Sequence, residues 1–83
     1  MKLLYFAWVR QKIGRSEEEL NPPADVTTVA SLMDYLRGRG PGYHAAFENP
    51  DRLRCAVNQE HARLDARVGP NDEVAFFPPV TGG

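Results

Sequence analysis

The pattern of apolar positions predicts a strand at the start of the chain. Residues 2–7 are apolar on both alternating faces, with Leu4 and Phe6 on one side and Leu3 and Tyr5 on the other. A strand that is apolar on both faces is typical of the interior of a sheet. We therefore predict that residues 2–7 form a central strand.

The next stretch combines a short helix with a charged strand. Two apolar residues four positions apart within residues 9–13 are followed by Gly14, which favours one helical turn ending at the glycine. Residues 16–20 then predict a second strand in which Glu17 and Glu19 face water. Edge strands often carry charge because it discourages pairing with other chains. We therefore expect this strand at an edge of the sheet.

One amphipathic helix is predicted near the middle of the chain. Thr28 suits the N-cap position. After it, apolar side chains recur at i, i+3, i+4 and i+7 on one stripe, formed by Val29, Leu32, Met33 and Leu36. Gly38 and Gly40 end this helix, and residues 41–48 favour a short second one. The stripe predicts core packing, and we expect Leu32 and Leu36 to share a core with Val74.

Two further strands complete the predicted fold. Residues 53–57 predict one strand, residues 58–61 a turn, and residues 73–77 the last strand. The order strand, strand, helix, strands is that of the ubiquitin-like β-grasp, an α+β fold. We predict a mixed sheet of four to five strands packed on one main helix. The chain is expected to be a single domain over residues 1–83, with a flexible tail at 78–83.

A helix on one face of the sheet leaves the other face uncovered. Too many of the predicted strand residues are apolar for a surface that faces only water. Apolar patches of this kind commonly mark interaction sites. We therefore predict that a protein partner covers this face.

Length and charge narrow the class of function. A chain of 83 residues has room for one small core and little space for a concave catalytic pocket, which favours a carrier or binding module over a self-sufficient enzyme. The net charge of −1, with both signs interspersed, predicts neither nucleic acid nor an anionic membrane as a partner. No membrane span is predicted. The single cysteine cannot form an internal disulfide, which fits a reducing, cytoplasmic location.

The cysteine and the histidines predict no catalytic or metal site. Cys55 has no base nearby in the sequence and is expected to point inward as a buried structural thiol. His44 and His61 are far apart and lack a supporting carboxylate or cysteine spacing, so neither is expected to bind zinc. We therefore predict no metal and no bound cofactor.

The candidate chemistry lies in the last eight residues, which read Phe76-Phe77-Pro78-Pro79-Val80-Thr81-Gly82-Gly83. The two prolines cannot donate to a sheet ladder and favour an extended conformation, so they end the strand and carry the chain away from the body. From Pro78 to Gly83 the chain can reach roughly 20 Å, at about 3.3–3.6 Å per residue. The glycine pair lets the backbone enter a narrow channel. The tail thus presents the terminal carboxylate of Gly83.

A carboxylate at neutral pH is a poor electrophile, because its charge is delocalised and oxide is an impossible leaving group. Its use therefore requires activation, most simply as an acyl-adenylate, which implies ATP and a separate activating enzyme. Glycine suits that step because no side chain crowds the carboxyl group.

These residues resemble a known family. Residues 72–83 are similar to the C-terminus of the small, sulfur-carrying subunit of molybdopterin synthase, and the resemblance extends through residues 3–7, Thr28-Val29 and residues 56–59. Related carriers for thiamine and for tRNA thiolation, and ubiquitin itself, share the terminal Gly-Gly but not the Phe-Phe-Pro-Pro sequence before it. The whole tail is therefore the specific motif.

The resemblance implies a sulfur carrier. The carboxylate of Gly83 would be adenylated by an ATP-dependent activating enzyme, converted to a thiocarboxylate, and used to donate sulfur to a cyclic pyranopterin precursor of molybdopterin. Family members assemble with the large subunit of the synthase as a heterotetramer, and the catalytic groups would belong to that large subunit. The carrier itself would bind no cofactor, since the activating enzyme consumes the ATP.

The resemblance also implies roles for particular residues. Gly83 would carry the reactive group and Gly82 would precede it in a narrow channel. The implied docking residues are Phe6, Phe77, Pro78, Pro79, Val80 and Thr81. His61 falls at a further docking position where the family more often has an aliphatic residue, and the alternative is an ordinary exposed histidine in a turn.

Other functions are also consistent with the sequence. The chain could be a ubiquitin-like modifier joined through Gly83 to a lysine of another protein, which an isopeptide-linked ladder would reveal. It could also carry sulfur for thiamine or tRNA thiolation. A third class is a plain β-grasp interaction module with an incidental Gly-Gly, for which removing Gly83 would change nothing.

Overall fold

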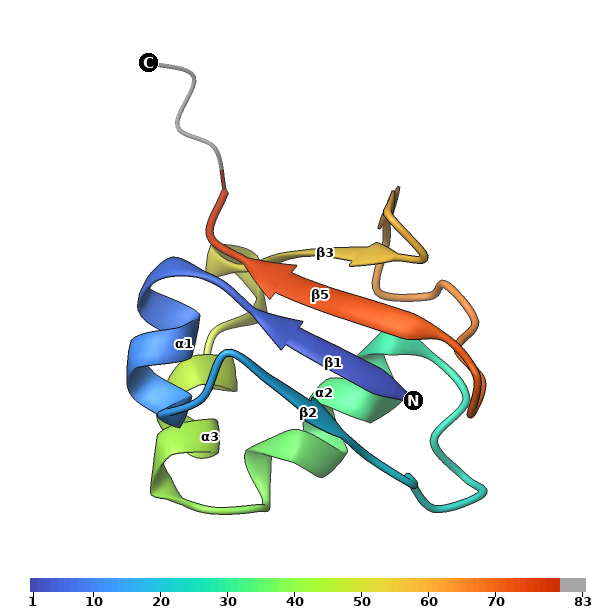
Figure 1. Ribbon diagram of the computed structural model, residues 1–83, viewed down its shortest axis with the longest axis horizontal. Coiled ribbons are helices and arrows are strands. Elements are labelled where there is room, and N and C mark those ends of the chain that lie inside the picture. The colour runs from blue at the N-terminus through green and yellow to red at the C-terminus, as the bar shows by residue number, and fades with distance from the viewer. Residues whose placement is uncertain (80–83) are drawn as a thin grey trace.

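The structure, a computed structural model, describes residues 1–79, which form a five-stranded mixed sheet with helices on one side (Figure 1). The strands are β1 (Lys2–Tyr5), β2 (Glu17–Glu19), β3 (Arg54–Val57), β4 (Glu60–Ala62) and β5 (Glu73–Phe77). The helices of this part of the chain are α1 (Ala7–Ile13), α2 (Val29–Arg37), α3 (Pro41–Phe47) and the 3₁₀ helix η1 (Pro50–Arg52). The predicted α+β, β-grasp fold is confirmed, with α3 packed against the main helix α2 and α1 packed against α3.

The last strand lies at the centre of the sheet. The strand order is β2-β1-β5-β3-β4, in which β5 pairs parallel with β1 and antiparallel with β3. β1 is internal, as predicted, because β2 pairs with its other edge. It ends at Tyr5, however, and not at Ala7, since Ala7 has a φ of 54° and opens α1.

The inward side chains of the sheet and one face of each of the helices α1, α2 and α3 form the core. Its fully buried members include Leu3, Tyr5, Val9, Val29, Leu32, Leu36, Phe47, Val74 and Phe76. The predicted burial of Leu32, Leu36 and Val74 in one core is confirmed. Phe76 of the central strand packs edge-to-face on Phe47 of α3, with ring centroids 5.0 Å apart. Such aromatic pairs add stability beyond the area they bury.

The helix α2 begins where the sequence predicts. Thr28 is the N-cap, and its hydroxyl accepts a hydrogen bond of 3.1 Å from the Ser31 backbone N–H. The Ser31 hydroxyl in turn accepts one of 2.9 Å from the Thr28 N–H. This reciprocal capping box satisfies two backbone donors that the helix leaves unpaired, so the start of α2 is fixed by local chemistry.

Strand β2 lies at an edge of the sheet, as predicted, but its middle residue is not solvated. The side chain of Glu18 is only 5% exposed, whereas its two neighbours in the strand face water. Its carboxylate accepts hydrogen bonds from the hydroxyls of Tyr5 at 2.8 Å and Tyr43 at 2.7 Å, and from Arg39 at 2.9 Å. Glu18 therefore joins the sheet edge to α3 and to the loop before it.

We expect the fold to lose stability in acid as Glu18 becomes protonated. Burial alone would raise the pKa of the Glu18 carboxyl, but hydrogen bonds from Tyr43, Tyr5 and Arg39, with the charge of Arg39, outweigh it and hold that pKa below its usual value of 4.5. A lowered folded-state pKa gives stability that is present above the unfolded pKa and is lost as pH falls through the folded one. The free energy of unfolding should therefore decrease as the pH drops below about 4.5.

Denaturant unfolding from neutral pH to about pH 3 measures this effect. Glu18→Gln should lower the free energy of unfolding at neutral pH by on the order of 1–3 kcal/mol, because its partners lose a charged acceptor. Its acid dependence should also be shallower than that of the wild type. Glu19→Gln makes the same chemical change on the solvent side of β2 and should follow the wild type. If the free energy of unfolding of Glu18→Gln and of the wild type followed the same curve against pH, the stabilising role of Glu18 would be contradicted.

Candidate functional site

The face of the sheet that points away from the helices carries the candidate site. Strand pairing places Leu4 beside Ala75, Ala75 beside Ala56, and Ala56 beside His61. By the alternation of side chains, Phe6 extends the outward series of β1 and Phe77 extends that of β5. We call this set the open face; its members are Leu4, Phe6, Ala56, His61, Ala75 and Phe77. Within residues 1–79 none of the six is fully buried.

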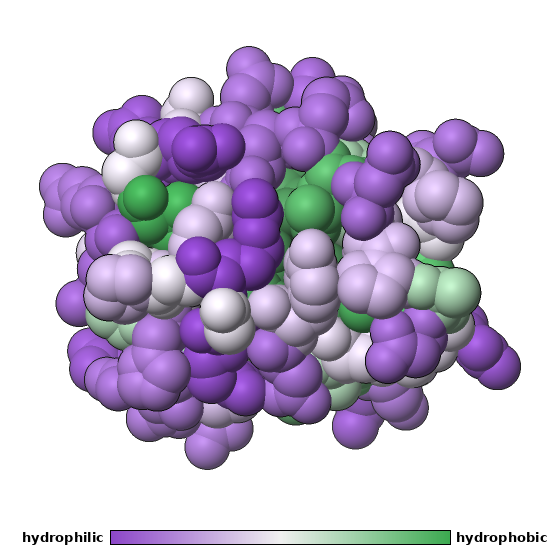
Figure 2. All heavy atoms as spheres, turned by 90° about the horizontal axis from the view of Figure 1, so that it is seen from below, coloured by the Kyte–Doolittle hydropathy of each residue, from purple (hydrophilic) through white to green (hydrophobic). Residues whose placement is uncertain are grey.

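The helical side of the molecule looks different. Figure 2 views the molecule from below Figure 1, on the side where α2 and α3 lie, and shows a surface that is mostly hydrophilic with small separate apolar spots. The helices thus cover the inward face of the sheet and present polar groups to water. The open face has no such cover in the described part of the chain.

Phe6 is held outward at the end of β1. Its side chain is 49% exposed, although its N–H donates a hydrogen bond of 3.1 Å to the Phe76 carbonyl and continues the pairing of β1 with β5. The next residue, Ala7, has a φ of 54°, in the left-handed region that costs an L-residue about 1–2 kcal/mol. That conformation turns the chain out of the sheet directly after Phe6. The aromatic ring therefore lies exposed beside the end of the central strand.

The position of His61 corrects one prediction. The expected turn over residues 58–61 is confined to Asn58 and Gln59, and His61 lies within strand β4. Both turn residues have positive φ, 52° and 70°, which is the pattern of a type I′ hairpin. The two-residue turn leaves His61 paired with Ala56 of β3. His61 is therefore an exposed strand residue of the open face and not a turn residue.

His61 contacts Phe77 across the open face. Their ring centroids are 5.5 Å apart and the ring planes are nearly perpendicular, at 87°. The residue between them on β3 is Ala56, whose small side chain leaves room for this contact. Edge-to-face pairs of this kind are worth about 0.5–1.5 kcal/mol. The structure thus brings Phe6, Phe77 and His61 onto one surface, and their docking role stays a prediction.

The hairpin that carries His61 is fastened to the start of β5. The side-chain oxygen of Asn58 accepts a hydrogen bond of 3.0 Å from the Glu73 N–H, and its amide nitrogen donates one of 2.9 Å to Asp72. The hydrogen bonds from Asn58 and from the Gly69 backbone lower the pKa of the Asp72 carboxyl. Asp72 is therefore a charged acceptor at neutral pH. These contacts fix β4 relative to the central strand.

The central strand ends at Phe77, as predicted, and Pro78 and Pro79 follow it with partly buried side chains. The sequence expectations for Val80, Thr81, Gly82 and Gly83 lie outside the described residues. The structure thus places the start of the predicted tail at the end of the central strand, next to Phe6.

Charged residues of both signs surround the apolar part of the open face. They are Lys2, Glu17, Glu19, Arg54 and Glu73. Lys2 and Glu17 form an exposed ion pair of 3.4 Å. An apolar centre with a polar rim is the usual composition of a protein–protein interface. The arrangement therefore fits docking better than binding of a small ligand.

Cys55 and the histidines show no arrangement suited to other chemistry. Cys55 is buried, its Sγ lies 3.4 Å from the Ala62 carbonyl, and burial raises the pKa of its thiol. A raised pKa makes a thiol a poorer nucleophile at neutral pH. Among residues 1–79, no cluster of three His, Cys, Asp or Glu side chains could hold a metal ion. No helix of that part of the chain is long and apolar enough to cross a membrane.

Three members of the open face, Leu4, Ala56 and Ala75, were not predicted as site residues from the sequence. Ala56 and Ala75 are small and give no strong signal by themselves. Alternation within β5 could have assigned Ala75, since it lies two positions before Phe77. Ala56 required knowledge of the pairing between β3 and β5, which only the structure provides.

The fold and the open face define a small β-grasp domain with an exposed apolar face on its sheet. Residues 3–83 match the ThiS family. The match spans nearly the whole chain, and the chain belongs to this family.

Individual relatives agree with that assignment. The chain is 40% identical to the "Molybdopterin synthase sulfur carrier subunit" of Escherichia coli K12 over 83 residues, covering 100% of this chain and 99% of that one. Among solved structures, a putative molybdopterin converting factor subunit 1 from Pyrococcus furiosus superposes with a TM-score of 0.75 at 31% identity, covering 95% of each chain. Small archaeal modifier protein 1 of Haloferax volcanii superposes with a TM-score of 0.73 at 28% identity, covering 96% of this chain and 97% of that one. The resemblance found in the tail is thereby confirmed.

Proposed function

We propose that this chain is the sulfur carrier subunit of molybdopterin synthase. One observation carries the proposal. The central strand β5 ends on an exposed apolar face and continues through Pro78-Pro79 to a terminal Gly82-Gly83, in a chain that matches the Escherichia coli subunit over its full length. A partner docked on the open face would therefore meet the start of the tail at the same place.

In this proposal the terminal carboxylate of Gly83 is the working group. An ATP-dependent activating enzyme adenylates it, and replacement of the adenylate by sulfur gives a thiocarboxylate. The tail then enters the large subunit of the synthase, where the sulfur passes to a cyclic pyranopterin precursor of molybdopterin. The carrier supplies the reactive group and its position, and the partners supply the catalytic groups.

The open face supplies the docking energy. Aromatic side chains dominate the energetics of most interfaces because each buries a large apolar area with few rotatable bonds. Phe6 and Phe77 flank the end of β5, where the tail begins, and His61 supports the Phe77 ring. Docking here would place the carrier so that its tail points into the partner.

We expect Phe77→Ala and Phe6→Ala each to weaken binding to the large subunit by more than about 1 kcal/mol, as truncation of aromatic anchors commonly does. Affinity measured by calorimetry checks this. The matched control is Leu64→Ala, because Leu64 is 46% exposed and lies beside inward-facing Cys55 and Ala62 on the other side of the sheet. Equal affinity for the wild type and both phenylalanine variants would contradict docking on the open face.

The similarity to small archaeal modifier protein 1 supports a second candidate function. In that case Gly83 would be joined to lysines of other proteins. Immunoblots of the native host would then show a ladder of larger species that resists thiol reagents. A sulfur carrier gives no such ladder and accumulates a thiocarboxylate.

A further inference from the structure

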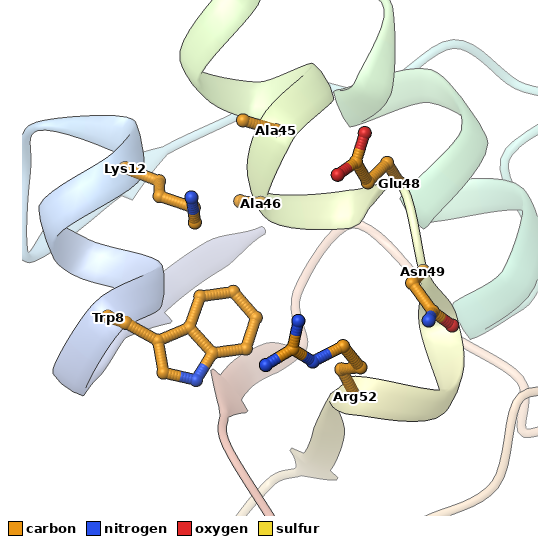
Figure 3. Close-up of a pocket in the computed structure, with 7 residues that line it drawn as sticks. All are labelled: Trp8, Lys12, Ala45, Ala46, Glu48, Asn49 and Arg52. Atoms are coloured by element: carbon orange, nitrogen blue, oxygen red, sulfur yellow. The ribbon is translucent and has the colours of Figure 1, made fainter.

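A second hollow lies outside the open face, between α1, α3 and η1. Its volume is about 300 Å³. Its lining residues are Trp8, Lys12, Ala45, Ala46, Glu48, Asn49 and Arg52. Figure 3 shows the side chains of Trp8 and Lys12 from α1 and of Arg52 from η1 converging on the same space. We call this hollow the Trp8 pocket.

The Trp8 pocket combines an indole surface with two cations that lack acidic partners. The guanidinium carbon of Arg52 lies 6.0 Å from the centre of the Trp8 ring, at the outer limit of a cation–π contact. Within residues 1–79, neither Lys12 nor Arg52 lies within 4.0 Å of a carboxylate. Trp8 is only partly buried although it is the largest side chain of the protein. A partly exposed indole beside two cations without acidic partners suggests an anionic occupant.

Charge and size favour a single carboxylate. Lys12 and Arg52 contribute two positive charges and Glu48 on the opposite wall contributes one negative charge, so the lining carries a net charge of about +1. One carboxylate neutralises that charge, whereas a polyphosphate would leave excess negative charge close to Glu48. Arg52 can bind a carboxylate through two parallel N–H donors. The indole and the two alanines accommodate the apolar stem of a Glu or Asp side chain.

The Trp8 pocket lies next to the open face. Trp8 comes two residues after Phe6, and Arg52 comes two residues before Arg54, which pairs with Phe77. Both walls of the pocket are thus continuous with the end of the sheet where the tail begins. A protein that contacts the end of the sheet where the tail begins would therefore lie close to this hollow.

We propose that the Trp8 pocket receives an acidic side chain of the large synthase subunit and so sets the orientation of the docked carrier. This inference rests on the proposed function, because the proposed function identifies the large subunit as the partner. The open face supplies apolar area without a preferred direction. A charge-assisted hydrogen bond at one end of that face fixes the rotation of the carrier about its docking axis.

Binding to the large subunit tests the Trp8 pocket. Arg52→Glu and Lys12→Glu should each weaken binding about tenfold or more at low salt, and the salt dependence of the remaining affinity should be shallower. Arg52→Gln should weaken binding less than Arg52→Glu, since it removes a charge without adding repulsion. Arg67→Glu makes the same charge reversal at an exposed site outside the pocket and should change affinity by less than about twofold.

Trp8 gives a second readout, since it is the only tryptophan of the chain. Labelling the carrier alone with 5-fluorotryptophan produces one fluorine resonance, and unlabelled large subunit adds none. That resonance should shift when the wild-type complex forms. An unchanged resonance in a saturated complex would overturn the proposal.

The outcomes separate this inference from the proposed function. If Phe77→Ala weakens binding while the Arg52 and Lys12 variants bind like the wild type, the Trp8 pocket inference is overturned and the proposed function stands. If the large subunit does not bind the wild-type carrier at all, the proposed function fails with it. Saturable binding of ADP by the isolated carrier, abolished by Arg52→Glu, would identify a nucleotide as the occupant. That result would overturn the proposal that the pocket receives an acidic side chain.

Discussion

Deleting Gly83 should abolish molybdopterin formation while leaving the fold intact. The deletion moves the terminal carbonyl back by one residue, about 3.5 Å along the chain. Reacting atoms must be held within about 3–3.5 Å of each other, so a displacement of this size is enough to prevent the reaction. The core lies in residues 1–79 and does not depend on this glycine.

Molybdopterin formed from the cyclic precursor by carrier, activating enzyme and large subunit measures the effect. Adding one glycine after Gly83 should be as damaging as the deletion, because it displaces the carbonyl by the same distance in the other direction. Gly82→Ala should be milder but still harmful, since its Cβ enters a narrow channel. Free energies of unfolding should match that of the wild type in all three variants. Full activity of the Gly83 deletion would contradict both the carrier and the modifier functions.

Replacing Leu36 by alanine should lower the free energy of unfolding by on the order of 2–5 kcal/mol. Leu36 is fully buried in α2 and belongs to the core formed with Leu32 and Val74. Truncation removes buried apolar area and leaves a cavity that close-packed neighbours fill only in part. For a domain of this size, that loss is a large fraction of the total stability.

Denaturant unfolding checks this value, and Leu64→Ala is the matched control. The same change is made there at a leucine that is 46% exposed, so the loss should be within about 0.5 kcal/mol. A near-zero effect at Leu36 would mean that α2 does not pack on the sheet as described. Similar losses at both positions would show that the effect does not depend on burial.

Local signals predicted the elements whose ends depend on nearby residues. The helix α2 was predictable because its cap, Thr28 with Ser31, and its apolar stripe lie within a few residues of each other. The end of β5 at Phe77 was predictable because the two prolines after it cannot join a ladder. Alternation along β1 placed Phe6 on the same face as Leu4, and only the family resemblance implied that Phe6 faces a partner.

Features that depend on distant parts of the chain were not predictable. The run of glutamates in β2 indicated a solvated edge, and nothing local shows that Glu18 meets Tyr43, 25 positions later. The hairpin turn consists of Asn58-Gln59, without the glycine that usually marks a type I′ turn, so His61 was assigned to the turn. The Trp8 pocket is built from three elements and becomes visible only when they pack together.

The mass of the C-terminal peptide, isolated from the native host, tests the central claim most directly. A host that lacks the large subunit should accumulate the loaded carrier. The account predicts a peptide ending at Gly83 whose mass shows one oxygen replaced by sulfur, and this protein should form molybdopterin when the large subunit and precursor are added. Finding only the carboxylate form, or only peptides joined to lysine, in that host would contradict the sulfur carrier.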